Sequence, residues 1–505
     1  MESTNSNLFP AKISEEDWAN TPESVKALLR ELTERIRVLE ETCAHLKEQL
    51  KRTSENSSQP PSQDQSKGFK VKRKAKSSKP RGAQPGHRGG TQPELYPVEE
   101  CKDVIHHYPE HCCDCGHPLT KEDALPPLRH QIVDIPPLQP EVIEHQFHTV
   151  ECPECGTINR AYDAKIINGS RYGVRLCALV GLLSGEYRQT HRMVLKLLSE
   201  LFDIDISVGS VGNLRKEMSE AIAQPVSEAH EYVKQQAHAG VDETSFTQGN
   251  ADGNNPKKTK GWLWVIVTPL VCYFQVFLSR AQAAAQTMLG AAFGGTVNSD
   301  RCPSYNWLKL EQRQLCWAHL KRDFIKISER GDPSKQLGEA LLEQERLLFE
   351  LWHRFKGGSL TRTQLISEVA PIRQKIKELL SKAAAFELEK GDKSPWAKTV
   401  RTCRQLLKVE PAFWLFVNTE GVEPTNNAAE QAIRPAVLWR RCSYGSQSAK
   451  GSLFVGRMLT VVATLRCQKR KVFEYLVEAC RAKRNGEPAP SLLPNSSLAN
   501  APLNS

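Results

Sequence analysis

The stretch from residue 237 to residue 300 constrains the fold most, because four strand-like runs and one helix-like run follow one another there in a definite order. The runs AHAGVDETSFTQ, GWLWVIVTPL and VCYFQVFLSR are apolar or alternate between apolar and polar residues, as strands do. The run AQAAAQTMLGAAF favours a helix, and GGTVNSDRC contains a fourth short strand. The predicted order is therefore strand, strand, strand, helix, strand.

This order is that of the opening of the ribonuclease H-like fold, in which the strand after the helix lies parallel to the first. Asp242 lies within the first predicted strand, and Asp300 lies at the end of the fourth. If those strands are neighbours, both carboxylates emerge together. An Asp in a strand is costly to bury unpaired and needs a compensating cation. Taken alone, each Asp is also explained as an ordinary turn residue.

Glu430, in the stretch TNNAAEQAIRP, is the third carboxylate of a predicted magnesium site. Mg²⁺ prefers hard oxygen ligands, and two such ions about 4 Å apart can hold the attacking and leaving oxygens at a phosphorus atom. The interval from about 303 to 424 contains two strongly helical runs and is predicted to be a helical insertion. Alone, the spacing of Glu430 and Arg434 would favour a surface ion pair. The two aspartates favour a catalytic role instead.

Two Cys-x-x-Cys pairs predict a structural zinc site before this domain. The predicted ligands are Cys112, Cys115, Cys152 and Cys155. Each pair is followed by a glycine, and four thiolates complete a tetrahedral coordination. Cys113, His111 and His117 lie close enough to replace one ligand, so the exact set stays open. The residues between the pairs alternate enough to predict two strands, as in a zinc ribbon.

The N-terminal part of the chain predicts a coiled coil followed by a basic linker. An apolar seam from Val25 to Leu50 alternates steps of four and three residues, which favours self-association over a helix packed on its own core. Residues 54–95 are rich in Ser, Pro and Gly and are predicted to be disordered. Nine Lys and Arg and no acidic residue lie between Lys67 and Arg88, in a chain of net charge +10. This segment is predicted to bind DNA phosphates with little sequence preference, through Lys70, Lys72, Arg73, Lys74, Lys76, Lys79, Arg81 and Arg88.

The region from 166 to 236 is predicted to be helical. A helix, turn and helix around Ile206 to Met218 would place Asn213, Arg215 and Lys216 outward, toward a DNA major groove. A packed helical bundle explains the same pattern equally well. The most apolar run of the chain is short and interrupted by polar residues, so no membrane segment is expected. Cysteines in Cys-x-x-Cys pairs indicate metal binding rather than disulfides, and the expected location is the cytoplasm.

The ordered set of motifs resembles the transposases of the bacterial insertion sequence 66 family, a branch of the Asp-Asp-Glu transposases with a ribonuclease H-like core. The motifs are SKPRGAQPGHRGG, the two cysteine pairs, VDETS, SDRCPSYNWL, CWAHLKRDF and NNAAEQAIRP. The resemblance implies that Asp242, Asp300 and Glu430 hold two Mg²⁺ or Mn²⁺ ions. With these ions the protein would cut at the element's ends and join the freed 3′-hydroxyl to target DNA. The resemblance also points to zinc at the four cysteines.

Further expectations follow from the same resemblance. His319, Lys321 and Arg322 are expected near the DNA or the metals, although helix packing explains His319 equally well, and Arg434 is expected to orient Glu430 or to contact a phosphate. Expected partners are DNA, a second copy of the chain and small accessory proteins encoded by the same element, in a nucleoid-associated bacterial protein. The alternatives are a nuclease without strand transfer and a catalytically decayed, zinc-dependent DNA-binding protein. The chain departs from the family pattern at Arg301, Cys302 and Gln431.

The predicted fold class is multidomain α/β. In chain order we expect a coiled-coil segment at 1–53, a basic linker at 54–95, a zinc-binding domain at 96–165, a helical region at 166–236, a ribonuclease H-like catalytic domain at 237–440 with its insertion at about 303–424, and a C-terminal helical segment and tail at 441–505.

Overall fold

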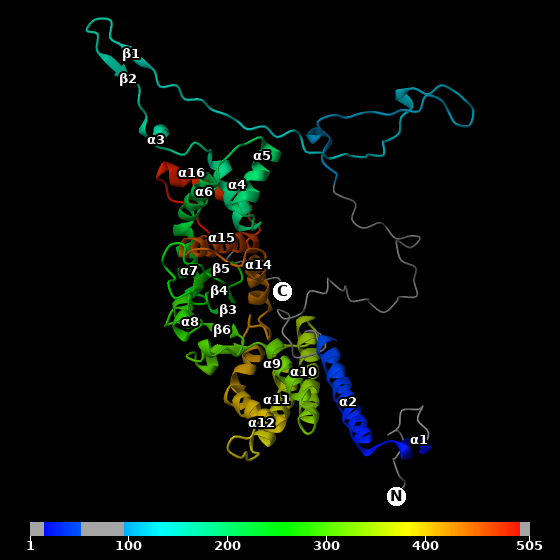
Figure 1. Ribbon diagram of the computed structural model, residues 1–505. Coiled ribbons are helices and arrows are strands. Elements are labelled where there is room, and N and C mark those ends of the chain that lie inside the picture. The colour runs from blue at the N-terminus through cyan, green and yellow to red at the C-terminus, as the bar shows by residue number, and fades with distance from the viewer. Residues whose placement is uncertain (1–14, 52–94, 495–505) are drawn as a thin grey trace. The chain divides into compact units, whose positions relative to one another are not determined.

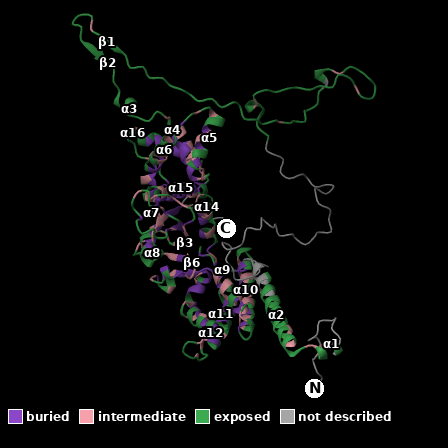
Figure 2. Cartoon of the chain, viewed as in Figure 1, coloured by how far each residue is buried: buried purple, intermediate pink, exposed green. Residues whose placement is uncertain are grey.

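The computed structural model describes residues 15–51 and 95–494 (Figure 1). The predicted DNA contacts between Lys70 and Arg88 lie outside the described residues. The larger of two compact units includes residues 146–198 and 205–494, and the smaller includes 95–145 and 199–204. Buried residues lie in the sheet, in the helices packed on it, in the helical bundle that precedes it and in the helices between residues 317 and 418, all within the larger unit (Figure 2).

One five-stranded sheet forms the centre of the larger unit. Its strands lie in the order β5-β4-β3-β6-β7. Strand β3 pairs with β4 antiparallel and with β6 parallel, while β4 pairs with β5 antiparallel and β6 with β7 parallel. The expected order of strands and helix is confirmed, and so is the parallel placement of the fourth strand beside the first. The elements are β3 (His238–Ser245), β4 (Trp262–Val267), β5 (Cys272–Phe277), α8 (Gln282–Leu289), β6 (Thr296–Ser299) and β7 (Arg313–Leu315).

Helix α15 (Ala449–Cys467) packs on β5, which is an edge strand of this sheet. Edge strands expose unpaired backbone groups, and here two threonine hydroxyls of the helix bind them. The Thr460 hydroxyl accepts the backbone N–H of Phe274 at 2.9 Å. The Thr464 hydroxyl accepts the N–H of Cys272 at 3.1 Å and donates to the carbonyl of the same residue at 3.0 Å. The C-terminal segment is thus bound directly to the sheet.

A helical bundle precedes the sheet in the chain and is completed by the last helix. Helix α6 packs against α4, α15 and α16, and its residues Val211, Leu214 and Met218 are buried. The Arg215 guanidinium lies 4.3 Å from the ring centre of Phe454, so the expectation that this side chain faces outward is wrong. Asn213 and Lys216 are exposed. The helices are α4 (Val174–Gly185), α5 (His191–Phe202), α6 (Val208–Ala221), α7 (Ala223–Lys234) and α16 (Val472–Asn485).

The interval between β7 and α14 is helical, as expected, but the insertion begins after β7 and not at about residue 303, because residues 313–315 form a fifth strand of the sheet. Its core is rich in aromatic side chains, with Trp317, Phe413 and Trp414 almost fully buried against one another. An ion pair between the half-exposed Arg373 and the buried Glu410 (2.9 Å) joins two of its segments. The helices are α9 (Trp317–Ser328), α10 (Ser334–Lys356), α11 (Arg362–Ala384), α12 (Pro395–Lys408) and α13 (Leu415–Asn418), followed by α14 (Asn427–Ser443).

The N-terminal part contains helices α1 (Glu15–Asn20) and α2 (Glu23–Lys51). The helix predicted there is confirmed, and its self-association stays a prediction. The expected strand pair between the cysteine pairs is wrong. Strand β1 (Thr149–Glu151) ends directly before the second cysteine pair and pairs with β2 (Ile158–Arg160), which follows that pair. The short helix α3 (Ala164–Ile167) comes next. Three prolines between residues 136 and 140 interrupt the predicted run, because proline has no N–H for a strand ladder. None of the described helices has the length and apolar composition needed to cross a bilayer.

We predict that Thr464→Val destabilises the larger unit, because valine fills the same space but leaves the backbone N–H and carbonyl of Cys272 without partners. The expected loss is about 1–3 kcal/mol in the free energy of unfolding, measured by urea titration. Thr287→Val is the matched control, since the Thr287 hydroxyl binds the Ala283 carbonyl on the exposed surface of α8. Equal effects of the two substitutions would contradict this account of the strand edge.

Candidate active site

The three predicted carboxylates come from three separate elements of the larger unit. Asp242 lies on β3, Asp300 directly follows β6, and Glu430 lies in the first turn of α14, which packs on β3 and β4. Burial raises the pKa of Asp242 well above its usual range, and the negative charges of Glu243, Asp300 and Glu430 raise it further. The structure therefore brings the three predicted residues together, although a long insertion separates the last two in sequence.

Asn426 holds the start of α14 against β3. Its buried side chain donates through Nδ2 to the Val241 carbonyl at 2.7 Å, and its backbone N–H donates to the Cys316 thiol at 3.2 Å. Gly240 allows this approach, because a Cβ there would lie 2.9 Å from Asn426 Oδ1. Glu430 is thereby fixed beside the strand that bears Asp242.

The segment before α14 is also tied to β6 and α9. The Asn298 side chain donates to the carbonyls of Glu423 at 2.8 Å and Thr425 at 3.0 Å. The backbone N–H of Trp317 donates to the Pro424 carbonyl at 2.9 Å. Residues 423–426 therefore bind the two strands that bear the aspartates and the first turn of the insertion. Neither Asn298 nor Asn426 was among the residues predicted from sequence.

Glu243 is a fourth carboxylate at the site, and it already has partners. The Tyr305 hydroxyl donates to it at 2.6 Å, and Arg280 donates from Nε at 2.9 Å and from Nη2 at 2.7 Å. Burial raises its pKa, while the bonds from Tyr305 and Arg280 oppose the shift. Its oxygens come close to Asp300 and Cys302. Because both oxygens are hydrogen-bonded, Glu243 is less suited than the other three to hold a cation.

The turn after β6 is built around the backbone of Asp300. Asp300 Oδ1 accepts the Cys302 N–H at 2.8 Å, and the buried guanidinium of Arg313 donates to the Asp300 carbonyl at 2.8 Å. The Arg301 side chain forms an ion pair with Asp323 at 2.7 Å. Cys302 contributes only its backbone N–H to the carboxylate, which nearly any residue supplies. The unusual residues at positions 301 and 302 therefore leave the Asp300 carboxylate in place.

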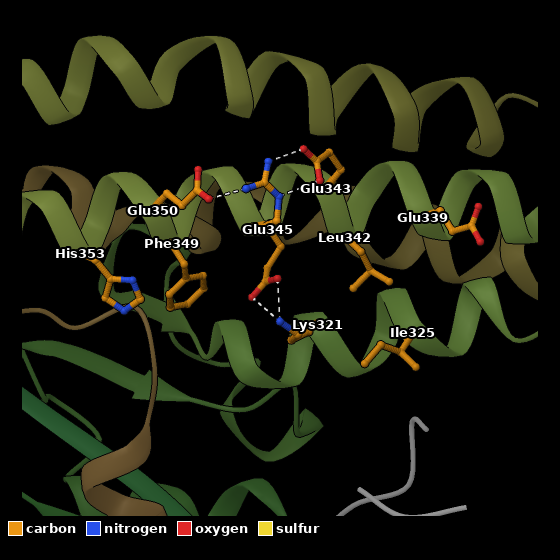
Figure 3. Close-up of a pocket in the computed structure, with 10 residues that line it drawn as sticks. Lys321, Ile325, Glu339, Leu342, Glu343, Glu345, Phe349, Glu350 and His353 are labelled. Atoms are coloured by element: carbon orange, nitrogen blue, oxygen red, sulfur yellow. Dashed lines mark hydrogen bonds and ion pairs between the residues drawn. The ribbon is translucent and has the colours of Figure 1, made fainter. Parts of the chain in front are cut away.

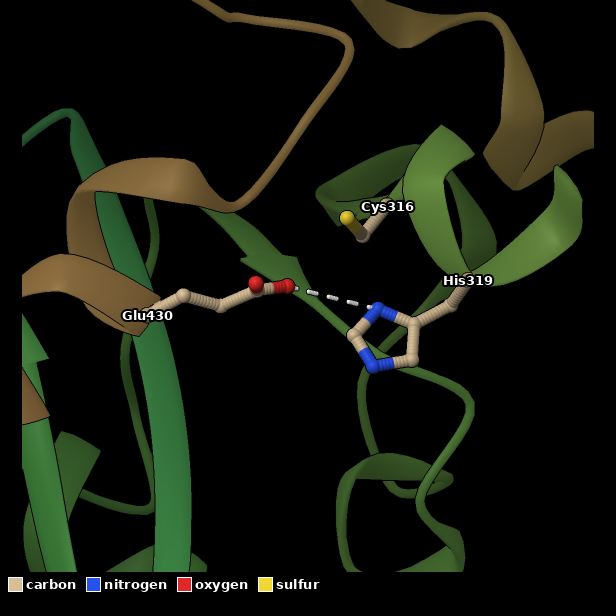
Figure 4. A group of neighbouring side chains, drawn as sticks. All are labelled: Cys316, His319 and Glu430. Carbon is tan, nitrogen blue, oxygen red and sulfur yellow. Dashed lines mark ion pairs between the residues drawn. The ribbon is translucent and has the colours of Figure 1, made fainter. Parts of the chain in front are cut away.

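His319, on α9, faces Glu430 (Figure 4). The distance between His319 Nδ1 and Glu430 Oε1 is 3.6 Å, and Cys316 Sγ lies within 4.8 Å of a ligand atom of each residue. Burial lowers the pKa of His319, while the negative charges of Asp300 and Glu430 oppose the shift. Lys321 instead contacts Glu345 on α10, at 2.9 and 3.1 Å, in the wall of a separate cavity between the two helices (Figure 3). Arg322 is half-buried.

Glu430 and Arg434 form no ion pair within the described part of the chain. Arg434 is exposed and has no ion-pair partner among the described residues. The alternative of a surface brace on α14 is therefore wrong. The Glu430 carboxylate faces His319, and the Arg434 guanidinium is exposed.

The two cysteine pairs adopt the same local turn. Gly116 N–H donates to the Cys112 carbonyl at 3.0 Å, and Gly156 N–H donates to the Cys152 carbonyl at 2.9 Å. Both glycines have positive φ angles, 72° and 70°, which a residue with a side chain rarely adopts. This turn leaves thiol groups beside backbone amides, as zinc knuckles require.

Comparison with known families decides the classification. The model described as "Transposase IS66 family" matches residues 169–453, which include all three carboxylates. The chain belongs to the IS66 transposase family. The zinc-finger binding domain of transposase IS66 matches residues 109–156 of this IS66 member, which supports structural Zn²⁺ there. A family of unknown function matches residues 14–93.

Two curated relatives of this IS66-family chain are both named as uncharacterized proteins of Sinorhizobium fredii (strain NBRC 101917 / NGR234). Protein y4qI is 29% identical over 258 residues, covering 46% of this chain and 45% of the relative. Protein y4hP is 24% identical over 268 residues, covering 47% of this chain and 46% of the relative. The chain thus spans about half the length of the curated relatives it matches.

We predict that Asn426→Ala loosens the attachment of α14, because the Val241 carbonyl loses a buried partner. The free energy of unfolding should fall by about 1–3 kcal/mol in urea titrations. Asn427→Ala is the matched control, since Asn427 is the exposed neighbour in the same sequence. A loss no larger in Asn426→Ala than in Asn427→Ala would contradict the role given to Asn426.

We predict that Asp242→Asn stabilises the metal-free chain at neutral pH. The folded-state pKa of Asp242 is raised, so stability falls as pH rises from the ordinary carboxyl pKa of about 3.9 toward the folded value. Asparagine removes this cost, and the gain at pH 7 should be about 1–3 kcal/mol, shrinking as the pH falls toward 4.

Asp392→Asn is the control for that measurement, because a hydrogen bond from the Ser394 N–H lowers the pKa of the exposed Asp392. It should give no gain at pH 7. An Asp242→Asn variant as stable as the wild type at pH 7, in urea titrations with chelator present, would contradict the electrostatic account.

Proposed function

We propose that the chain is a DNA transposase that cuts at the ends of an insertion sequence and joins the freed 3′-hydroxyl to target DNA. The observation that carries the proposal is the convergence of Asp242, Asp300 and Glu430 from β3, β6 and α14. Three antiparallel strands, a helix and two parallel strands support a ribonuclease H-like core. The match to the transposase family supports the same activity.

The three carboxylates fit Mg²⁺ or Mn²⁺. None of them forms an ion pair with a Lys or Arg among the residues that the structure describes. Glu430 Oε1 is buried and has no hydrogen-bond partner in the same part of the chain. Closely spaced carboxylates without counterions favour a hard divalent cation. Two such ions would supply Lewis-acid activation of the attacking oxygen and stabilisation of the leaving oxygen.

The sheet and α14 hold the three carboxylates and Arg434 in place. The paired strands β3 and β6 fix Asp242 and Asp300, and the N-terminal turn of α14 is a favourable place for the negative charge of Glu430. Arg434 lies one turn further along α14 and would contact a DNA phosphate through its exposed guanidinium. Glu243, the neighbour of Asp242 in β3, is bound by Tyr305 and Arg280 and helps to hold this end of the strand in place.

DNA binding is proposed to involve segments outside the site as well. The Lys- and Arg-rich stretch between Lys67 and Arg88 would add salt-sensitive affinity with little sequence preference. The exposed apolar seam of α2, which includes Leu32, Ile36 and Leu39, would pair with a second copy of the chain. Accessory proteins of the same element are further proposed partners.

The proposal is tested by the Glu430→Gln variant on labelled DNA carrying the inverted repeats that flank the gene. Loss of this carboxylate should lower Mg²⁺-dependent cleavage by at least about 100-fold, or roughly 2.7 kcal/mol of barrier. The thermal midpoint should stay close to that of the wild type. Glu423→Gln is the matched control, because Glu423 precedes α14 and its carboxylate forms a surface ion pair with Lys356.

Three outcomes would contradict parts of the proposal. Cleavage by Glu430→Gln within a few-fold of the wild type would remove Glu430 from the catalytic set. Nicked DNA without joined products in the wild type would establish a nuclease without strand transfer. Binding of the repeats without any cleavage by the wild type would favour a catalytically decayed DNA-binding protein.

A further inference from the structure

His319 Nδ1 and Glu430 Oε1 face each other across 3.6 Å (Figure 4). This distance is too long for a hydrogen bond. Both atoms are buried, and neither has a hydrogen-bond partner in the described part of the chain. Each buried polar atom without a partner lowers the stability of the fold by about 1–3 kcal/mol. A ligand bound between two such atoms that face each other would satisfy both.

A shared divalent cation fits the separation of the two atoms. Two ligand atoms that each lie about 2.1 Å from one cation are roughly 3.0–3.5 Å apart, depending on the coordination geometry. The observed 3.6 Å is slightly longer than the upper end of that range, so a small movement of either side chain would bring both atoms into coordination distance. Carboxylate oxygen and neutral imidazole nitrogen are both common metal ligands.

The surroundings hold the two ligands in place. Cys316 directly precedes α9, and its thiol accepts the Asn426 backbone N–H. Trp317 is the first residue of α9, and its backbone N–H donates to the Pro424 carbonyl. The helix that bears His319 and the helix that bears Glu430 are thus hydrogen-bonded to each other at their first turns. The Cys316 thiol already accepts a hydrogen bond from the Asn426 N–H. In this group of three residues, His319 Nδ1 and Glu430 Oε1 are therefore the atoms without a hydrogen-bond partner among the described residues.

We propose that His319 is a direct ligand of the cation that Glu430 binds. The inference rests on the proposed function for the identity of the site and adds a nitrogen ligand to its three carboxylates. A nitrogen ligand favours divalent transition metals over Mg²⁺, since imidazole binds Mg²⁺ poorly. His319 would therefore shift the preference of the cation site at Glu430 toward Mn²⁺ relative to Mg²⁺.

The test uses the full-length, untagged and zinc-loaded chain titrated with Mn²⁺. Electron paramagnetic resonance counts the bound Mn²⁺, and its pulsed form detects a directly coordinated nitrogen. The wild type should show nitrogen coupling, and labelling of its histidines with ¹⁵N should change that coupling. His319→Gln should lose the coupling and weaken Mn²⁺ binding by at least about tenfold.

His353→Gln is the matched control, because His353 is an exposed histidine of α10 in the same insertion. It should keep both the coupling and the Mn²⁺ affinity. Bound Mn²⁺ without nitrogen coupling in the wild type would overturn the inference, and so would coupling that persists in His319→Gln. Even if His319→Gln folds poorly, a wild-type coupling that does not change on ¹⁵N-histidine labelling would overturn the inference.

Failure of this inference differs from failure of the proposed function. A wild type that cuts DNA with Mn²⁺ but shows no nitrogen coupling keeps the transposase proposal and loses the His319 ligand. A wild type that shows histidine coupling but never cuts keeps the ligand and loses the transposase proposal.

Discussion

The hydrogen bond from the Asn426 side chain to the Val241 carbonyl is the contact on which the candidate site depends. The chain leaves the sheet after β7, builds a helical insertion with its own aromatic core, and must then return Glu430 to β3. Closing so long an excursion costs conformational entropy, which local contacts at its two ends have to offset. Asn426, Asn298 and the bare backbone of Gly240 provide those contacts.

The return of the chain from the insertion to β3 also brings negatively charged side chains near one another. Asp242, Asp300 and Glu430 approach one another without Lys or Arg partners among the described residues, while Glu243 is compensated by Arg280 and Tyr305. The folded chain therefore retains an electrostatic cost at one place, seen in the raised pKa of Asp242. A divalent cation bound there, as proposed, would relieve that cost and would link the stability of the site to its proposed chemistry.

The features predicted correctly have strong local signals. Strands β3 to β6 follow from alternating or apolar runs, and the cysteine turns follow from Cys-x-x-Cys-Gly. The features that were missed depend on distant partners. Asn426 precedes a helix and would be predicted as its N-cap, yet its side chain binds β3 instead. Arg215 was expected to face outward, but an aromatic ring more than two hundred residues away covers it.

The most direct measurement is the anomalous scattering of Mn²⁺ in crystals of the full chain bound to a DNA end. The account predicts anomalous peaks in contact with the carboxylates of Asp242, Asp300 and Glu430. Mn²⁺ bound elsewhere in the chain while these three carboxylates remain without metal would contradict it.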